Sequence, residues 1–190
     1  MTKITAILLL MFFSANSLAA QQINCLAKLY HEYIENRVDL FSKAKAIMAN
    51  SDHDSFLIYK SQLNISITAA VLNKIAFNHL LENKPSYLKL DGKITRIVPS
   101  LDQYLAYSQG KPLPSSINKV YTFLENKSDF KKAYSNWQSS RESLKQNSAS
   151  NDDKIKAYNL YKTILANQLK TEFELETSFF QMDANNLTCN

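Results

Sequence analysis

SFLIYKSQLNISITAAVLNKIAFNHLLEN, residues 55–83, is the stretch that decides the fold. Apolar residues recur at helical spacing on two nearly opposite sides of it. One side carries Phe56, Tyr59, Leu63, Ile67, Ala70, Phe77 and Leu81, and the other carries Ile58, Ile65, Leu72, Ala76 and Leu80. A helix that is apolar on both sides needs neighbours on both flanks, so we expect residues 55–83 to form the central helix of a bundle. Asn73, Lys74 and Asn78 argue against a membrane-spanning helix.

Glycine and proline interrupt the chain at few places. Only 2 glycines and 4 prolines occur in 190 residues, and all the prolines lie between Pro85 and Pro114. Long segments without helix breakers on both sides of that region predict an all-α chain. We expect a single-domain bundle of five to seven helices, with residues 84–114 as an irregular, basic connection. Helices are predicted at 23–49, 55–83, 101–108 and 151–189, and from Ser115 and Ser128 onwards.

The first twenty residues have the composition of a secretory signal peptide. Lys3 is followed by an apolar run from Ile4 to Phe13 and by the small-residue exit Ser17–Ala20. The run is shorter than the roughly 20 residues that a membrane-spanning helix needs. We therefore expect residues 1–20 to be removed, leaving residues 21–190 as one exported helical domain without a membrane span, in the periplasm or outside the cell.

The sequence contains two cysteines, Cys25 and Cys189, one near each end of the expected domain. An exported chain reaches an oxidising compartment, so two cysteines predict one structural disulfide. In the chain-entropy model, closing so long a loop contributes on the order of 5 kcal/mol. The first helix would lead away from this bond and the last helix would return toward it. If these two helices pack together, they are therefore antiparallel.

The net charge of the chain is mild. The full sequence carries +5, and removal of Lys3 leaves 21 basic against 17 acidic residues, or +4. That excess is smaller than proteins that bind a nucleic-acid duplex usually carry, so we expect no nucleic-acid partner.

The basic excess is concentrated in the middle of the chain. It comes from Lys84, Lys89, Lys93, Arg96, Lys111 and Lys119, offset by Asp91 and Asp102. Tyr87, Tyr104 and Tyr107 lie in the same segment. Cationic and aromatic side chains together are typical of a surface that contacts a protein partner. The alternative is a solvated connection whose tyrosines pack inward.

Local motifs for catalysis, metals or cofactors are missing from the sequence. His31, His53 and His79 fall on different predicted elements and have no second ligand at metal spacing. The sequence contains no Gly-rich phosphate loop, no Gly-x-Ser-x-Gly, no His-Glu-x-x-His and no Cys-x-x-Cys-His. We therefore expect no metal and no cofactor, and hydrolase and haem functions lack support.

Three charged residues lie on otherwise apolar helical faces: Arg37, Glu172 and Glu176. Arg37 is twelve residues from Cys25, and Glu176 is thirteen residues from Cys189. At about 1.5 Å per helical residue, both charges lie roughly 18–20 Å from the expected disulfide. The register therefore places Glu176, with Glu172 close by, opposite Arg37.

Two interpretations of these charges remain open. The first is a structural ion pair, because a buried arginine or glutamate without a partner is costly. The second is a polar pocket in the bundle, where the charges around Arg37 bind or transform a small polar or anionic ligand.

The residues around Arg37 are faintly similar to a known family. Residues 34–37, IENR, followed by Leu40, resemble the first long helix of exported all-helical chorismate mutases, which place an arginine on its inner face. The resemblance implies a small-molecule enzyme or sensor with its pocket at Arg37. The family completes its site with a later lysine and with an Arg-Glu pair that opens the next helix. Met48 and residues 52–56 occupy those places here.

One function is favoured by three observations together: the expected export, the lack of catalytic motifs and the basic segment in the middle of the chain. We expect a non-enzymatic exported protein that acts by binding another protein, of the immunity, inhibitor or accessory type. The alternative is the small-molecule enzyme or sensor with its pocket around Arg37.

Overall fold

A computed structural model describes residues 2–50, 53–146 and 150–184, and all regular elements in these ranges are helical. The α-helices are α1 (Thr2–Met48), α2 (His53–Asn83), α3 (Leu101–Ser108), α4 (Ser115–Leu124), α5 (Ser128–Gln146), α6 (Asn151–Asn167) and α7 (Lys170–Gln181). Two short 3-10 helices, η1 (Pro85–Tyr87) and η2 (Ile94–Arg96), lie between α2 and α3. Seven α-helices in the described ranges confirm the all-α bundle.

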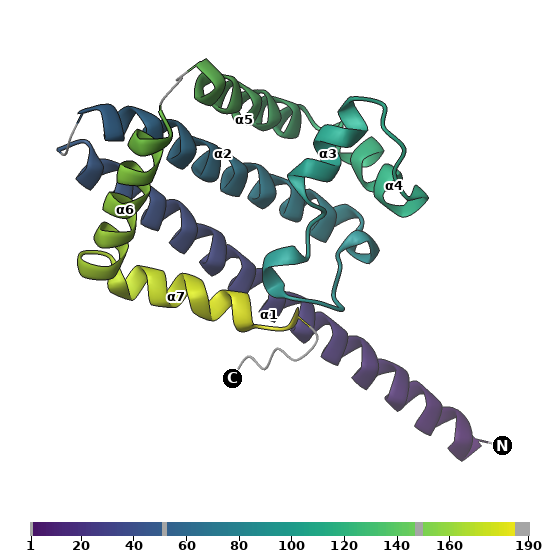
Figure 1. Cartoon of the computed structure of the whole chain (residues 1–190). Helices are drawn as coiled ribbons and strands as arrows, with labels where there is room; N and C mark the ends of the chain where they lie inside the picture. Colours follow the sequence, from purple (N-terminus) through teal and green to yellow (C-terminus); the bar gives the residue numbers. More distant parts are fainter. Residues whose placement is uncertain (1, 51–52, 147–149, 185–190) are drawn as a thin grey trace.

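Helix α2 is the centre of the bundle, as its two apolar sides predicted. It packs against α1, α5 and α6 (Figure 1). Tyr59, Leu63 and Phe77 are buried on one side, and Leu72 and Leu80 on the other. Neighbours on both flanks explain why both sides of the sequence are apolar.

The buried side chains form two clusters along α1 and α2. The larger cluster includes Tyr30, Ile34, Phe77, Leu80, Ile97, Tyr121 and Phe130, and the smaller includes Leu40, Met48, Tyr59, Leu63, Ile164 and Leu165. On α1 the clusters are separated between Ile34 and Leu40, and Arg37 lies in this gap. The polar residue therefore occupies the boundary between two apolar cores.

Helix α1 begins well before the predicted Ile23. It is continuous from Thr2, and its N-terminal part extends away from the rest of the bundle (Figure 1). Among the helices of the described ranges, none has the length and apolar character needed to span a membrane. The signal peptide at residues 1–20 stays a prediction.

The single long helix predicted for residues 151–189 is wrong. The structure has two helices there, α6 and α7, and the chain turns at Gln168 and Leu169. No glycine or proline marks this turn, so no helix breaker indicated it in advance. The turn allows Leu165 and Leu169 to pack into the smaller core cluster while α7 leaves in a new direction.

The turn also changes which apolar residues are buried. Ile155, Tyr158, Phe173 and Phe180, which a single straight helix would place on its inner side, are exposed. A helical face is continuous only along one axis, so a pattern that crosses the α6–α7 turn cannot define a single buried stripe.

Helices α1 and α7 contact each other and run antiparallel. Tyr33 packs its ring against Phe179 at 5.6 Å between centroids, whereas Lys43, further along α1, reaches Glu172 at the start of α7. Residue numbers thus rise on α1 as they fall on α7, which is the antiparallel relation predicted for the first and last helices.

The connection between α2 and α4 contains the predicted short helix, at the predicted residues 101–108. Ser100 caps it, and a capping box links the side chains and backbones of Ser100 and Gln103. Gly110 follows the helix with φ +67°, the left-handed conformation in which glycine has no steric cost.

The C-terminal segment is pinned to this connection. Lys93 and Asp183 form an isolated antiparallel bridge. The Ile94 N–H donates to the Met182 carbonyl at 3.0 Å, and the Ala184 N–H donates to the Gly92 carbonyl at 2.8 Å. Cys189 lies outside the described residues, so its disulfide to the buried Cys25 stays a prediction.

Candidate functional site

The structure brings Arg37 and Glu176 together on the facing sides of α1 and α7. Arg37 Nη1 lies 3.2 Å from Glu176 Oε1 and donates to the Tyr33 hydroxyl at 2.6 Å. The guanidinium also lies 5.3 Å from the centre of the Phe41 ring, within cation–π range. We call Tyr33, Arg37 and Glu176 the charged layer.

Glu176 is the most enclosed charge of this layer. Only 6% of the residue is exposed, whereas 28% of the Arg37 side chain is. Burial raises the pKa of Glu176 above its ordinary value, and the nearby Arg37 charge offsets part of that rise. Glu176 Oε2 has no hydrogen-bond partner among the described residues. Arg37 and, to a smaller extent, a hydrogen bond from the Asn36 side chain offset the cost of burying this carboxylate.

Glu172 does not join the charged layer. Its Oε1 accepts from Lys43 Nζ at 2.8 Å, and Lys43 also pairs with Asp39 at 2.7 Å. The hydrogen bond from Lys43 lowers the pKa of Glu172. Of the two acids predicted to face Arg37, only Glu176 does so, because Glu172 lies one helical turn away and meets a different cation.

The position that would complete a chorismate-mutase-like site is apolar and buried. Met48, which stands where that family has a lysine, packs in the smaller core cluster with Leu40 and Ala44. It therefore offers no cation to a ligand near Arg37. Asp52, at the start of the other expected region, lies outside the described residues.

The basic residues of the connection have different surroundings. Lys93 donates to the Gln181 carbonyl at 3.0 Å and pairs with Asp183 at 2.9 Å, so it holds the C-terminal segment. The remaining five are exposed, and in the described ranges no carboxylate lies within 4.0 Å of their charged groups; they are Lys84, Lys89, Arg96, Lys111 and Lys119. Lys93 therefore has a structural contact that the other five lack, and its predicted place in a partner surface stays a prediction.

Two of these free lysines border a groove of about 920 Å³. The groove is lined by residues 85–91, by Pro99 and by four residues of α4: Ser116, Ile117, Lys119 and Val120. Leu88, Ile117 and Val120 are buried side chains of its lining, and Lys89 and Lys119 are exposed ones. We call it the basic groove. The sequence indicated its lysines, but the contribution of α4 depends on tertiary packing.

All three tyrosines of the connection belong to the larger core cluster or pack against it. Tyr104 is 2% exposed and packs edge-on against Tyr134, at 4.3 Å between ring centroids. Tyr107 is half-buried and stacks near Tyr104. Tyr87 alone lines the basic groove. The inward packing that the alternative predicted is therefore found for all three side chains, and Tyr87 also borders the groove.

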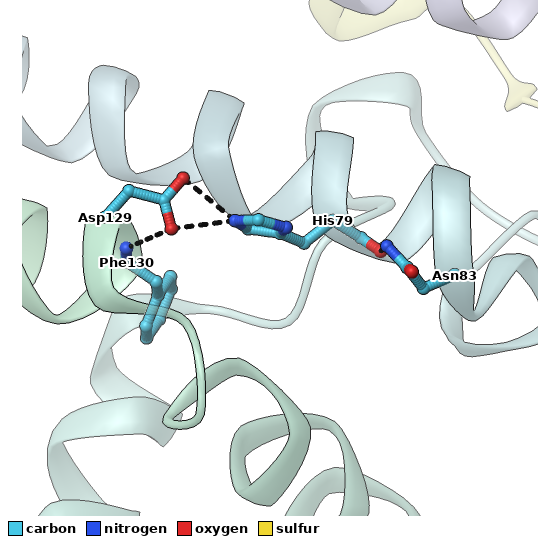
Figure 2. A network of polar contacts seen from close by, with 4 residues as sticks. All are labelled: His79, Asn83, Asp129 and Phe130. Atoms are coloured by element: carbon cyan, nitrogen blue, oxygen red, sulfur yellow. Dashed lines mark hydrogen bonds and ion pairs between the residues drawn. The ribbon is translucent and has the colours of Figure 1, made fainter.

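A histidine–aspartate pair joins α2 to α5 near the molecular surface (Figure 2). His79 Nε2 lies 2.8 and 2.9 Å from the two carboxylate oxygens of Asp129, and this contact lowers the pKa of Asp129. Asp129 also accepts from the Phe130 N–H, and Asn83 donates to the His79 carbonyl. Each partner lies at a helix end, so the pair orients α5 on α2. Sequence analysis did not identify it, because the two residues are fifty positions apart.

Metal-binding geometry is missing from the described part of the chain, where no group of three or more His, Cys, Asp or Glu side chains is placed to hold an ion. Comparison with known proteins found no matching family model, no similar curated protein and no similar solved structure.

Proposed function

We propose that this chain is an exported helical protein that acts by binding another protein, as an immunity, inhibitor or accessory factor, and that the basic groove is its contact surface. The observation that carries the proposal is the combination of an apolar lining with Lys89 and Lys119, two exposed lysines without a carboxylate partner among the described residues. Apolar area beside unpaired charge is the composition of a protein-binding surface.

Export is supported by the composition of residues 1–20 and by the geometry of α1. The N-terminal part of α1 extends away from the bundle, so cleavage after residue 20 would leave both core clusters intact (Figure 1). The disulfide is part of the same proposal. Ala184 is hydrogen-bonded to Gly92 next to η2, which contacts α1, the helix that carries Cys25. Five residues span up to about 17 Å, which gives Cys189 a wide reach from Ala184.

The charged layer favours the structural interpretation over a ligand pocket. Arg37 already has a carboxylate, a hydroxyl and an aromatic ring as neighbours, and Glu176 is enclosed. Charges arranged in this way compensate each other inside the fold. We therefore place partner binding at the basic groove and assign Arg37 to stability.

A photo-crosslinking side chain at Ser116 tests the proposal in cells that produce the protein. Ser116 is exposed and lines the groove, and the matched control is the same side chain at Lys111, which is exposed but does not line it. We expect a protein adduct from position 116 and none from position 111.

The identified partner is then purified, and its affinity is measured for the unmodified chain and for Lys89→Glu/Lys119→Glu. Charge reversal should weaken binding by about tenfold or more, with a steep dependence on salt. An affinity unchanged by the double reversal would refute the groove as the contact surface. Export would be refuted if the protein that carries the crosslinking side chain were found entirely inside the cell.

A further inference from the structure

We infer that the basic groove accepts an extended acidic segment of the partner, with one large apolar side chain between carboxylates. This inference deepens the proposed function and rests on it. It concerns the chemistry of the bound segment, which follows from how apolar and charged groups are arranged around the groove.

The lining of the groove offers apolar contacts. Leu88, Ile117 and Val120 present buried side chains from two different segments of the chain, and Leu90 stands exposed beside them. An apolar side chain placed there would lose contact with water on several sides, which is the main source of affinity at protein interfaces. This geometry fits one large aliphatic or aromatic anchor.

The charged groups of the groove select acidic neighbours for that anchor. Lys89 comes from the connection and Lys119 from α4, and neither has a carboxylate partner in the described ranges. Asp91 is the single acid among the lining residues, so the lining has a net positive charge. Because the two cations belong to separate segments with apolar side chains among the same lining, a ligand with carboxylates on both sides of an apolar group matches them.

The size of the groove fits several residues of a peptide. A volume of about 920 Å³ is at the upper end of the range for small-molecule pockets, about 300–1,000 Å³. Ser86 and Ser116 are also exposed residues of this lining, and a serine hydroxyl can donate a hydrogen bond to a peptide backbone or accept one from it.

The test uses the purified protein and a fluorescent peptide with one central leucine flanked by aspartates, with binding followed by fluorescence anisotropy. Two matched peptides replace the leucine by alanine or the aspartates by lysines. We expect each replacement to weaken binding by about tenfold or more. Equal binding of the alanine peptide would overturn the apolar anchor, and equal binding of the lysine peptide would overturn the acidic flanks.

Protein variants assign the binding to the groove. Ser116→Trp, at an exposed lining position, should block the peptide by filling the groove, and Lys89→Glu and Lys119→Glu should each weaken it by about tenfold. Lys111→Glu removes the same charge from the same basic segment outside the groove, so it should bind as the unmodified protein does. Circular dichroism confirms that each variant is folded. A Lys111→Glu effect as large as that of Lys119→Glu would show nonspecific attraction and overturn the inference.

The outcomes separate this inference from the proposed function. A partner that crosslinks at position 116 while the acidic peptide fails to bind would keep the function and overturn the extended-segment chemistry. A peptide that binds as expected, without any crosslinked protein in cells, would keep the groove chemistry and refute the function. Binding of a medium-chain fatty acid, with no binding of the peptide, would assign the groove to a free amphipathic carboxylate and overturn the inference.

Discussion

The charged layer and the basic groove use cations in opposite ways. In the charged layer, Arg37 lies at the boundary of two cores and has a carboxylate 3.2 Å away. In the basic groove, Lys89 and Lys119 lie on the surface with no acid in range among the described residues. The positive charge is used inside the fold in the first region and remains exposed to solvent in the second.

This difference shows that the sequence alone does not reveal the role of a charged residue. The role depends on which groups surround its side chain in the fold. Lys93 illustrates the point within the basic segment itself, because it pairs with Asp183, while Lys89, four residues earlier, has no carboxylate partner among the residues that the structure describes. The two regions should therefore differ in how much stability the protein loses when a cation is removed. Removing a cation should matter where the fold uses it and should have little effect where the fold does not.

Arg37→Met should cause the largest loss. It removes the cation that pairs with the enclosed Glu176 in the described ranges, while keeping most of the aliphatic packing. We expect a loss of about 3 kcal/mol in the free energy of unfolding, the low end for a broken buried pair because Arg37 is 28% exposed. Urea unfolding followed by circular dichroism measures it.

A double-mutant cycle distinguishes an unpaired charge from lost packing. Glu176→Gln in the Arg37→Met background should recover part of the stability, because the remaining side chain is then neutral. A loss below about 1 kcal/mol for Arg37→Met would instead indicate that Arg37 is not structural, and it would revive the ligand pocket.

The pH dependence of Glu176 should be a smaller effect of the same layer. Because burial raises its folded-state pKa above the unfolded value of about 4.3, the folded protein binds this proton more tightly than the unfolded chain does. Its contribution to stability is therefore greatest below the unfolded pKa and declines as pH rises through the folded pKa. The free energy of unfolding of the unmodified chain, minus that of Glu176→Gln, should fall as pH rises from about 4.

Groups with lowered pKa values shift stability in the other direction. Glu172 and Asp129 contribute stability above their unfolded pKa values and lose it as pH falls. Both residues are present in the unmodified chain and in Glu176→Gln, so their contributions cancel when the two free energies of unfolding are subtracted. If that difference rises with pH, attraction to Arg37 exceeds the cost of burying Glu176, and our assignment of the dominant cause is wrong.

Sequence periodicity predicted the parts of the fold that lie within single helices. The two apolar sides of residues 55–83 indicated the central helix, and Pro99 with Gly110 delimited residues 101–108. The pairing of Arg37 with Glu176 was predicted from a helical count back from Cys189, and the two side chains do meet. The helical rise assumed in that count holds only within α7, which ends at Gln181, and Cys189 lies outside the described residues.

Features that depend on contacts between distant segments were not predictable. The turn at Gln168 has no glycine or proline, and the assignment of Lys93 to Asp183 requires the C-terminal segment to be in place. The basic groove likewise needs α4 beside residues 85–91. Composition identified its lysines, but Ile117 and Val120 have the spacing of ordinary core residues, so nothing local marks them as a lining.

Lys93→Ala should cost less than either change in the charged layer. Its ion pair with Asp183 and its bond to the Gln181 carbonyl are both exposed to solvent. Such contacts contribute about 0.5–1 kcal/mol, and less at high salt. Unfolding curves at low and high salt measure this effect. The control is Lys111→Ala, whose side chain has no such contact in the described ranges, and an equal loss for both would refute the structural role of Lys93.

Lys89→Ala and Lys119→Ala should have the smallest effect on stability, within about 0.5 kcal/mol of the unmodified chain. Neither lysine has a carboxylate partner in the described part of the chain, so the fold loses no ion pair when they are removed. The same urea unfolding measures this. A loss above about 1 kcal/mol would place these lysines with Lys93 among the structural cations. Stability close to the unmodified value, together with weaker partner binding, is the combination that separates a binding cation from a folding one.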